Sequence, residues 1–485
     1  MIDDGQRTSS CSKLRKVETL RKAEARSVCQ SFDYFFSQFA DQGRWTLSSC
    51  CEFPSLGLFP QRPARHSFGR RAHALCSPIP LYPKMMSRVV RMRPLLLVTL
   101  VTALMPGGAS LAPSTARRQG VNLEMTTHRH PSGRDDGTPL EKFRVDLDDP
   151  PHVRWKHIMK ANREGARATM FYLFSSLPET VHSEVDVLIS NAEARLPAWA
   201  REEMLGVADA LNVTFGDVVI VNLFFEITPF CTSIVSQSAA SGLIYHARNM
   251  DFGLAMPQLS ASLRDIAIDV EFWNSGKLAF SATTFAGYVG VATGMRAGAF
   301  SVTANEREMT GSIPVPNIFK SLINLVNVLM STDAYPVTWA VRELLEKEDS
   351  DFDRVVSLLG ARKFATQMYL TVGGVSAGEG VVLTRGRNEL LNTWRINADD
   401  GEWFLVQTNY DHWIPMPPWD NRKAPAEKAI LEVGAEEISP STIYKRVLSR
   451  DPVLNQLTVY STTMSCSEGT YASRVRDCPK CSPFR

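Results

Sequence analysis

The chain has 485 residues, of which 44% are hydrophobic and 21% are charged. This composition is typical of a globular protein with a large core. The formal net charge is only +2, which argues against a dedicated nucleic-acid-binding protein, because such proteins carry a strongly basic surface.

A secretory signal peptide is predicted inside the chain. Three arginines at 88–93 precede the apolar run 95–104, and small residues follow it. This order is typical of such signals, and the run is too short to cross a bilayer. We assign the signal to residues 85–112. Residues 1–84, which hold five of the nine cysteines without periodic spacing, are interpreted as a gene-model extension or a disordered leader and are left out of the fold.

A polar linker at residues 113–142, expected to be disordered, leads to a mainly helical segment, 143–230. Within that segment, apolar positions at helical spacing predict an amphipathic helix at 197–211. Glu202 and Glu203 lie in its first turns, where the helix dipole favours acidic residues. Asn212-Val-Thr follows directly and is a glycosylation sequon at the expected helix end.

The run that begins at Cys231 is the most informative in the chain. It starts a predicted strand, 231–235, and a second strand, 243–248, follows a polar stretch with glycine, so a hairpin is expected. Asp251 lies just past the expected strand end. A cysteine in a strand is usually a small buried hydrophobe. Next to Asp251 and Arg248 the thiol becomes a candidate nucleophile; a half-buried ion pair is the competing interpretation of the two charges.

The rest of the chain alternates between strand and helix patterns. Six further strands are expected, and the turn Asn274-Ser-Gly joins the first two. The pattern favours an α+β fold in which helices cover two stacked antiparallel sheets. The expected strands are 266–272, 278–283, 300–303, 368–372, 381–384 and 403–408, and the expected helices are 318–330, 337–346 and 351–359.

A set of motifs keeps its order and spacing from about residue 143 to the C-terminus. The motifs are Cys231-Thr-Ser-Ile-Val, His246-Ala-Arg-Asn-Met-Asp-Phe-Gly, Thr284-Phe-Ala-Gly-Tyr-Val-Gly, Asn305-Glu-Arg, Gly378-Glu-Gly-Val-Val-Leu-Thr-Arg, Thr408-Asn-Tyr-Asp-His-Trp and Arg474-Val-Arg-Asp-Cys-Pro. Together they resemble the acid ceramidase and N-acylethanolamine-hydrolysing acid amidase family. The resemblance implies a cysteine hydrolase with the N-terminal-nucleophile fold, an αββα sandwich.

The resemblance also implies that the chain is a precursor. Its thiol would attack the carbonyl of Phe230 and cut the chain before Cys231, which yields a helical N-terminal subunit and a catalytic subunit, 231–485. Cys231 would then carry both the thiol nucleophile and a free α-amine, whose pKa of about 7.7–8.0 suits proton transfer. Arg248 and Asp251 are the implied catalytic partners of this residue.

Three further site residues come from the resemblance. Asn409 is implied as a side-chain donor to the oxyanion, although an asparagine at a strand end is more often a turn residue. Arg422 occupies the place of a family active-site arginine, but one of the paired acids that precede it in the family is an asparagine here. Glu306 matches a substrate-binding glutamate, and an ion pair with Arg307 or Arg296 is the alternative.

The cysteines after Cys231 are interpreted as disulfide partners. Cys478-Pro-Lys-Cys481 is a lone C-x-x-C pair, which is a weak indication of zinc. In an oxidising compartment a disulfide is favoured, and the pairing among Cys466, Cys478 and Cys481 stays open. Because residues 111–230 contain no cysteine, we expect packing alone to hold the two subunits together.

The implied reaction releases a fatty acid from an N-acylated lipid, without a metal ion or an organic cofactor. Ceramide is the first candidate substrate, since motifs such as Met250-Asp-Phe-Gly resemble the ceramidases more, and an N-acylethanolamine is the alternative. The implied partners are a membrane or micelle surface and a lipid-transfer protein, with no nucleic acid. The signal peptide favours the secretory pathway, ending in the lysosome or outside the cell.

Two other functional classes stay open. In a papain-like hydrolase, His412 or His246, which shares a strand face with Arg248, would activate Cys231 without chain cleavage. The second class is a non-enzymatic lipid-binding protein whose chain is never cleaved before Cys231. The apolar cluster at 170–174 is interpreted either as a core helix or as a lipid-facing lip around the active site.

Overall fold

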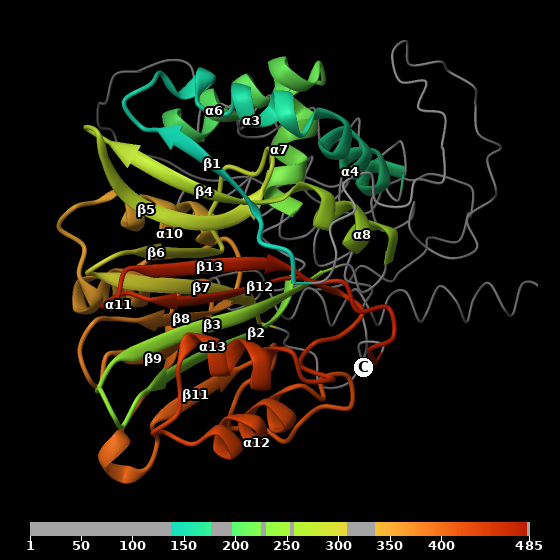
Figure 1. Ribbon diagram of the computed structural model, residues 1–485. Coiled ribbons are helices and arrows are strands. Elements are labelled where there is room, and N and C mark those ends of the chain that lie inside the picture. The colour runs from blue at the N-terminus through green and yellow to red at the C-terminus, as the bar shows by residue number, and fades with distance from the viewer. Residues whose placement is uncertain (1–136, 176–195, 225–228, 253–256, 308–334, 483–485) are drawn as a thin grey trace, which may run out of the picture. The chain divides into compact units, whose positions relative to one another are not determined.

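The structure is a computed structural model that describes residues 137–175, 196–224, 229–252, 257–307 and 335–482. The predicted signal peptide, the segment before it and the helix expected at 318–330 lie outside these residues. The described residues form two β-sheets that stack on each other and carry helices on their outer faces (Figure 1).

The larger sheet has eight strands in the order β1-β4-β5-β6-β7-β8-β9-β10. Neighbouring strands are antiparallel except β1 and β4, which are parallel. The expectation of purely antiparallel sheets is wrong at this edge, because β1 reaches β4 through a long connection that contains helices and the β2–β3 hairpin of the other sheet, which leaves the two strands parallel. The strands are β1 (Glu141–Asp146), β4 (Ala267–Asn274), β5 (Lys277–Phe285), β6 (Thr293–Arg296), β7 (Phe300–Glu306), β8 (Met368–Gly373), β9 (Gly380–Arg385) and β10 (Leu390–Arg395).

β1 also crosses the boundary that was expected between a disordered linker, 113–142, and a helical segment, 143–230. This short stretch pairs along its whole length with β4. Phe143 and Val145 alternate with charged residues, which is the pattern of a half-buried strand. The stretch is too short for that pattern to stand out in the sequence.

The smaller sheet has five antiparallel strands in the order β11-β2-β3-β12-β13. The predicted hairpin is confirmed as β2 and β3, and β2 is an interior strand. Asp251 lies inside β3, not past its end as expected, because β3 stays paired with both neighbours up to this residue. The strands are β2 (Pro229–Gln237), β3 (Ile244–Phe252), β11 (Phe404–Gln407), β12 (Thr458–Ser465) and β13 (Thr470–Val475).

Most strands were visible in the sequence. The expected strands are confirmed as β2, β3, β4, β5, β7, β8, β9 and β11, and Ser275 and Gly276 form the tight turn between β4 and β5 with φ of 50° and 73°. The sequence did not reveal β6, β10, β12 or β13. β12 is rich in Ser and Thr yet wholly buried, so it lacks the alternation of apolar and polar residues that marks a half-exposed strand.

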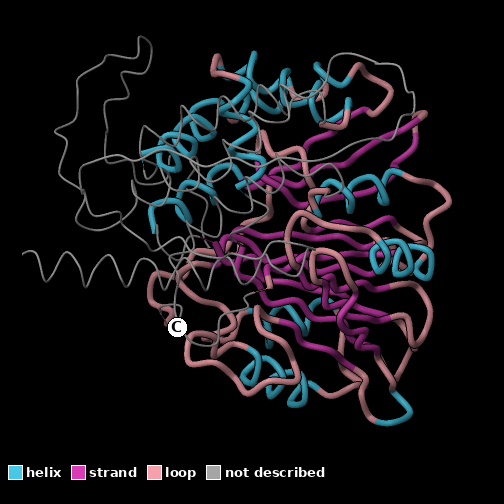
Figure 2. Tube along the Cα trace, turned by 180° about the vertical axis from the view of Figure 1, so that it is seen from behind, coloured by secondary structure: helices cyan, strands magenta, loops and turns pink. Residues whose placement is uncertain are grey.

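Helices cover the outer faces of both sheets, as Figures 1 and 2 show. α10 (Val337–Glu346) packs on β5, β6 and β7, and α11 (Phe352–Ala361) packs on β8 and β9. On the smaller sheet, α12 (Lys423–Val433) packs on β11, and the π-helix η5 (Ile443–Leu448), with the short α13 (Pro440–Thr442) before it, packs on β3 and β12. The expected αββα sandwich is confirmed.

The N-terminal helices lie beyond β1 and β4 in Figure 1. They are α3 (Lys156–Ala161), α4 (Arg163–Ser175), α6 (Ala198–Leu211) and α7 (Phe215–Phe224), with α8 (Pro257–Ile266) packed against α4. α6 confirms the amphipathic helix expected at 197–211, since Met204, Val207 and Leu211 are buried. Among the described helices, none alone is long and apolar enough to cross a membrane; α6 and α7 qualify only as a pair bent by 118°.

Polar side chains line part of the space between the two sheets, and an apolar cluster that includes Val235 and Val382 fills another part. Alternate residues of β4 such as Val270 join the apolar core under the helices, whereas Asp269 faces the second sheet. Thr283 donates a hydrogen bond of 2.7 Å to Asp269, and its hydroxyl also lies 2.6 Å from Ser473 and 2.8 Å from Tyr471 of β13. Burial raises the pKa of Asp269 to about 6, although the bonds from Thr283 and Ser473 oppose the shift.

Asp269→Asn should weaken the dependence of stability on pH. Because the folded pKa of about 6 lies above the ordinary 3.8, the bound proton stabilises the fold below pH 3.8, and this contribution is lost as the pH rises through about 6. The full loss is roughly 3 kcal/mol, of which roughly 2 kcal/mol falls between about pH 4.5 and about pH 7, and the variant should not show it. The free energy of unfolding in urea at about pH 4.5 and about pH 7 measures the difference. Glu436→Gln, an exposed control, should follow the wild type; unchanged pH dependence in Asp269→Asn contradicts the assignment.

Candidate active site

Cys231 lies near the start of β2, and its side chain is fully buried. In the register of the hairpin, Cys231 is opposite Met250 and Phe230 is opposite Asp251. The strand runs without a break through Phe230 and Cys231, so the structure shows the uncut chain. The sulfur and the nitrogen of Cys231 contact different groups of residues.

The sulfur faces the polar layer between the sheets. Arg248 donates a hydrogen bond from Nη2 to Sγ of Cys231, and Sδ of Met250 lies 3.6 Å from the same sulfur. Burial raises the pKa of the Cys231 thiol to about 11, and the charge of Arg248 opposes this shift. The thiol is therefore protonated at neutral and acidic pH in the uncut chain, and Arg248 is positioned to stabilise a thiolate when one forms.

Contacts from both sheets hold Arg248 in place. Its Nη1 donates to the carbonyl of Ala292 at 2.8 Å and to Oγ1 of Thr293 at 2.7 Å, and its Nη2 donates to the carbonyl of Ala304 at 3.3 Å. The hydroxyl of Tyr460 on β12 lies 2.9 Å from Oγ1 of Thr293. The guanidinium is thus fixed against the thiol by β6 and β7 on one side and, through Thr293, by β12 on the other.

The nitrogen of Cys231 faces a second cluster. Its N–H donates to Oδ1 of Asn409 at 2.9 Å, and Nη2 of Arg422 donates to the same oxygen at 2.8 Å. Nδ2 of Asn409 donates to the carbonyl of Glu306 at 2.7 Å. Two donors at Oδ1 and one acceptor at Nδ2 fix the orientation of this amide. Asn409 therefore presents its acceptor to the nitrogen of Cys231 and donates from Nδ2 to the carbonyl of Glu306.

Buried charges surround Arg422, which immediately precedes α12. Its guanidinium bonds to Asp251 at 2.9 Å and to both oxygens of Asp420 at 2.9 and 2.7 Å. Thr458 of β12 donates to Asp251 at 2.6 Å. Burial raises the pKa of Asp251, opposed by Arg422 and Thr458; burial lowers the pKa of Arg422, but Asp420 and Asp251 outweigh it and the net shift is upward. The cluster links β3, β12 and the segment before α12 through charge-assisted hydrogen bonds.

Glu306 ends β7 and is largely buried beside Asn409. The two arginines that competed for it in the sequence are engaged elsewhere. Arg307 pairs with Asp411 at 2.6 Å, and Arg296 donates to carbonyl groups of α10. The alternative of a strand-end ion pair is therefore not the arrangement found.

Sequence reasoning missed several residues that complete the site. Asp420 was visible only as an acid near Arg422. Thr293 and Thr458 had no signal, because a threonine in a strand is common and their contacts are remote in sequence. Asn305 belongs to a motif, yet its role was not assigned; it accepts from Ser233 at 2.7 Å and donates to the carbonyl of Gln407 at 3.0 Å, which joins β7 to the smaller sheet.

Neither histidine forms a thiol–imidazole pair with Cys231. The ring nitrogens of His246 lie 2.9 Å from the hydroxyls of Ser301 and Thr303, and burial, aided by Arg248, lowers its pKa to about 3. The ring of His412 stacks on Trp394 with 4.2 Å between centroids, and burial lowers its pKa to about 4. The papain-like alternative therefore lacks its catalytic pair.

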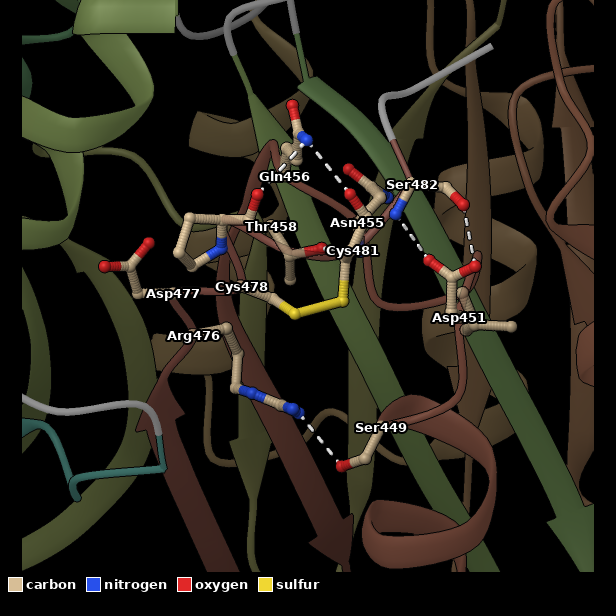
Figure 3. Close-up of a disulfide and its surroundings, with 12 residues drawn as sticks. Ser449, Asp451, Asn455, Gln456, Thr458, Arg476, Asp477, Cys478, Cys481 and Ser482 are labelled. Carbon is tan, nitrogen blue, oxygen red and sulfur yellow. Dashed lines mark hydrogen bonds between the residues drawn. A yellow bond between two sulfur atoms is a disulfide. The ribbon is translucent and has the colours of Figure 1, made fainter.

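The C-terminal cysteines lie apart from this site. Cys478 and Cys481 form a disulfide (Figure 3). Cys466 is a buried free thiol. Gln456 donates to the carbonyl of Cys481 at 2.9 Å, which anchors the turn that the disulfide closes. Within the described part of the chain, no group of three or more His, Cys, Asp or Glu side chains is arranged to hold a metal ion.

Comparisons with known proteins place the chain in a family. The family model described as the beta subunit of N-acylethanolamine-hydrolyzing acid amidase matches residues 138–196. The chain is 35% identical to the Rattus norvegicus N-acylethanolamine-hydrolyzing acid amidase over 344 residues, covering 70% of this chain and 90% of that protein. The chain belongs to the acid ceramidase and N-acylethanolamine-hydrolysing acid amidase family. It is 32% identical to Bos taurus acid ceramidase over 362 residues, covering 72% of this chain and 89% of that protein.

A solved structure of the family was also found. The Caenorhabditis elegans N-acylethanolamine-hydrolyzing acid amidase ortholog is 33% identical, with a TM-score of 0.42, and the match covers 49% of this chain and 93% of that one. Members of the family are amide hydrolases with an N-terminal nucleophile, and the resemblance seen in the sequence motifs is confirmed. The present chain is thus an amide hydrolase.

Thr293→Val should lower amide hydrolysis, because it removes the hydroxyl that holds Arg248 and keeps the side chain's shape. A hydrogen bond to a charged group is worth about 1.5–3 kcal/mol, so we expect a loss of about 10–100-fold in kcat/KM, together with a rise in the pH at which the thiol ionises. Thr293→Ser should restore activity.

The matched control for Thr293 is Thr371→Val. Thr371 is a buried threonine of β8 whose hydroxyl has no hydrogen-bond partner among the described residues. This variant should keep wild-type activity and the wild-type pH profile. An equal loss in the two valine variants contradicts the positioning role of Thr293.

Proposed function

We propose that the chain is a precursor that cuts itself between Phe230 and Cys231 and then hydrolyses the amide bond of an N-acylated lipid, with ceramide as the first candidate. The observation that carries the proposal is that the thiol and the backbone nitrogen of Cys231 each have a specific polar partner. Its thiol bonds to Arg248, and its nitrogen bonds to an amide that Arg422 orients. A structural cysteine in a strand needs neither arrangement.

Self-cleavage begins with attack of the Cys231 sulfur on the carbonyl carbon of Phe230. The C–S bond forms, the C–N bond breaks, and the thiol proton goes to the departing nitrogen, which becomes the α-amine of Cys231. Water then hydrolyses the thioester, leaving a carboxylate on Phe230 and a thiol on Cys231. Asn409 supports this step, because its Oδ1 already accepts from the nitrogen that must become the amine.

The freed amine is the base of the hydrolytic reaction. Its ordinary pKa of about 7.7–8.0 suits proton transfer, and it takes the thiol proton within the site, where Arg248 is placed to stabilise the thiolate. The thiolate attacks the lipid amide, the amine product leaves protonated, and water releases the fatty acid. Asn409, whose Nδ2 has two hydrogens and donates to the carbonyl of Glu306, is the proposed oxyanion donor, and Glu306, at the end of β7, binds substrate.

The leaving amine distinguishes the two substrates, sphingosine for a ceramide and ethanolamine for an N-acylethanolamine. Identities of 35% and 32% to relatives of the two kinds support both. Met250-Asp-Phe-Gly and Asp477-Cys-Pro favour ceramide. Parallel assays with the two lipids decide between them: faster turnover of the N-acylethanolamine would replace ceramide as the substrate and leave the cleavage proposal intact.

The apolar cluster at 170–174 fits the core-helix interpretation at some residues and the lipid-facing lip at another. Met170 and Leu173 of α4 are buried in the core, and Phe174 is half-buried against it, whereas Phe171 is 43% exposed. A single exposed phenylalanine next to core residues narrows the lipid-facing lip to Phe171. The lip is therefore proposed for Phe171 alone.

The chain is further proposed to enter the secretory pathway through the signal at 85–112 and to reach the lysosome. Asn212 supports glycosylation on this route. It ends α6 in the left-handed region with φ of 54°, and its side chain is exposed. Lipid substrate, a membrane surface and a lipid-transfer protein are the proposed partners.

Wild-type protein held at acidic pH should yield a fragment whose first residue is Cys231, and Cys231→Ala should remain uncut, because the attacking sulfur is gone. A denaturing gel with N-terminal sequencing of the larger fragment measures this. Cys466→Ala removes a second buried free thiol of the described residues and should be cut as the wild type is. An active enzyme recovered as one intact chain contradicts the proposal.

Phe171→Ser should lower hydrolysis of vesicle-bound ceramide about fivefold, since a partly buried phenylalanine contributes about 1 kcal/mol to lipid contact, and should leave hydrolysis of a short soluble N-acyl amide unchanged. Leu431→Ser, on α12 and 62% exposed, is the control and should change neither rate. Equal loss on both substrates would show that Phe171 serves only the packing of α4.

A further inference from the structure

Glu203 is a buried carboxylate remote from Cys231. It lies on α6, before the proposed cleavage point, and Arg342 lies on α10, after it. Nη1 of Arg342 donates to Oε2 of Glu203 at 2.6 Å, and Nη2 donates to Oε1 at 2.7 Å. Both side chains have 0% exposure. The pair is a two-point guanidinium–carboxylate contact out of reach of water.

Two more donors complete the shell of Glu203. Nε1 of Trp155 donates to Oε2 at 2.7 Å, and Nη1 of Arg154 donates to Oε1 at 3.0 Å. Each carboxylate oxygen therefore has two donors, one from each side of the proposed cleavage point. Glu203 was expected to interact with the helix dipole in the first turns of α6. That role is wrong, because its carboxylate points into the interior and accepts hydrogen bonds from these donors.

Arg342 is equally well enclosed. It donates to the carbonyl of Val289 at 2.8 Å and to Glu346 at 2.8 Å, and its guanidinium lies over the ring of Trp199 at 4.5 Å and that of Phe272 at 4.9 Å. Trp199, like Trp155 and Glu203, precedes Cys231. The N-terminal segment thus forms an aromatic and acidic receptor into which the catalytic segment inserts one arginine.

Other contacts join the same two segments. β1 pairs with β4, and Asn222 of α7 accepts from the N–H of Val289 at 2.8 Å and donates to the carbonyl of Gly287 at 3.1 Å. No cysteine occurs at 111–230, and Cys478 is bonded to Cys481. These segments therefore have no disulfide between them, and the expectation that packing alone joins them overlooks the ion pair.

We propose that the Glu203–Arg342 pair is a lock that keeps the N-terminal fragment bound after the cut, in place of a covalent link. The proposal rests on the self-cleavage proposed above. Replacing one partner removes the two-point contact inside the core and leaves the other with its lateral partner alone, Glu203 with Arg154 or Arg342 with Glu346. This loss at a buried site should be more costly than losing an exposed ion pair. Loss of the lock should therefore release the fragment at protein concentrations at which the wild type stays assembled.

The test measures dissociation of the cut protein in a dilution series, by size-exclusion chromatography with detection of both fragments. Arg342→Lys keeps the charge but loses the two-point contact, and Glu203→Gln keeps the shape. We expect each to raise the dissociation constant on the order of 100-fold. The double variant Glu203→Met with Arg342→Met should raise the dissociation constant no more than either single methionine substitution does. That non-additivity is the signature of a direct pair.

Lys142→Met is the matched control. Lys142 of β1 pairs with Glu271 of β4 at 2.9 Å across the same two segments, but its side chain is 57% exposed, so its loss should change the dissociation constant less than about fivefold. Equal effects of Lys142→Met and Arg342→Lys, or additive effects of the two methionine substitutions, would overturn the lock.

Failure of self-cleavage is separable from failure of the lock. A wild-type chain that stays a single band on a denaturing gel refutes the cleavage and leaves the pair measurable in the intact chain. Urea midpoints of the same variants then report the coupling. Non-additive loss supports the buried pair as the contact between the segments, and additive loss overturns it.

Discussion

The structure depends on the burial of polar and charged side chains between two stacked sheets. A buried polar group without a partner is costly, so these groups must satisfy one another. Arg248 meets this requirement with the Cys231 sulfur, the hydroxyl of Thr293 and the carbonyls of Ala292 and Ala304. Its position is set by strands of both sheets. The thiol is therefore placed by both sheets, and a change at the hydroxyl of Thr293 would alter the contacts of the arginine beside the Cys231 sulfur.

Cys231 stands at the border between two electrostatic environments. Its sulfur lies in the layer between the sheets beside one arginine, and its nitrogen faces the segment before α12, where Asn409 and Arg422 meet Asp251 and Asp420. In the first environment, the charge of Arg248 favours the thiolate. In the second, Oδ1 of Asn409 accepts a hydrogen bond from the nitrogen. A residue that is to act through both atoms needs such a division, because one cation close to both would disfavour protonation of the amine as much as it favours the thiolate.

The N-terminal segment contributes both a strand and a helix to the fold. β1 extends the larger sheet, and α6 places Glu203 where Arg342 enters from α10. The two-point contact specifies one relative position of the helices, since a guanidinium and a carboxylate match only in one plane. Apolar packing around it is less demanding of orientation. The ion pair thus fixes the relative orientation of the helices, whereas the aliphatic core contributes buried apolar surface.

The sequence by itself determined the local elements and the motifs. Alternation revealed the β2–β3 hairpin, helical spacing revealed α6 and α10, and the run from Cys231 to Asp251 pointed to the family and to a candidate nucleophile, because each signal spans a few neighbouring residues. Only the tertiary structure decided that Thr293 holds Arg248, that Asn409 turns its acceptor to the nucleophile, and that Glu203 meets Arg342. These contacts join residues far apart in the chain, and the side chains concerned are ordinary strand, turn and helix residues until the sheets stack and exclude water around them.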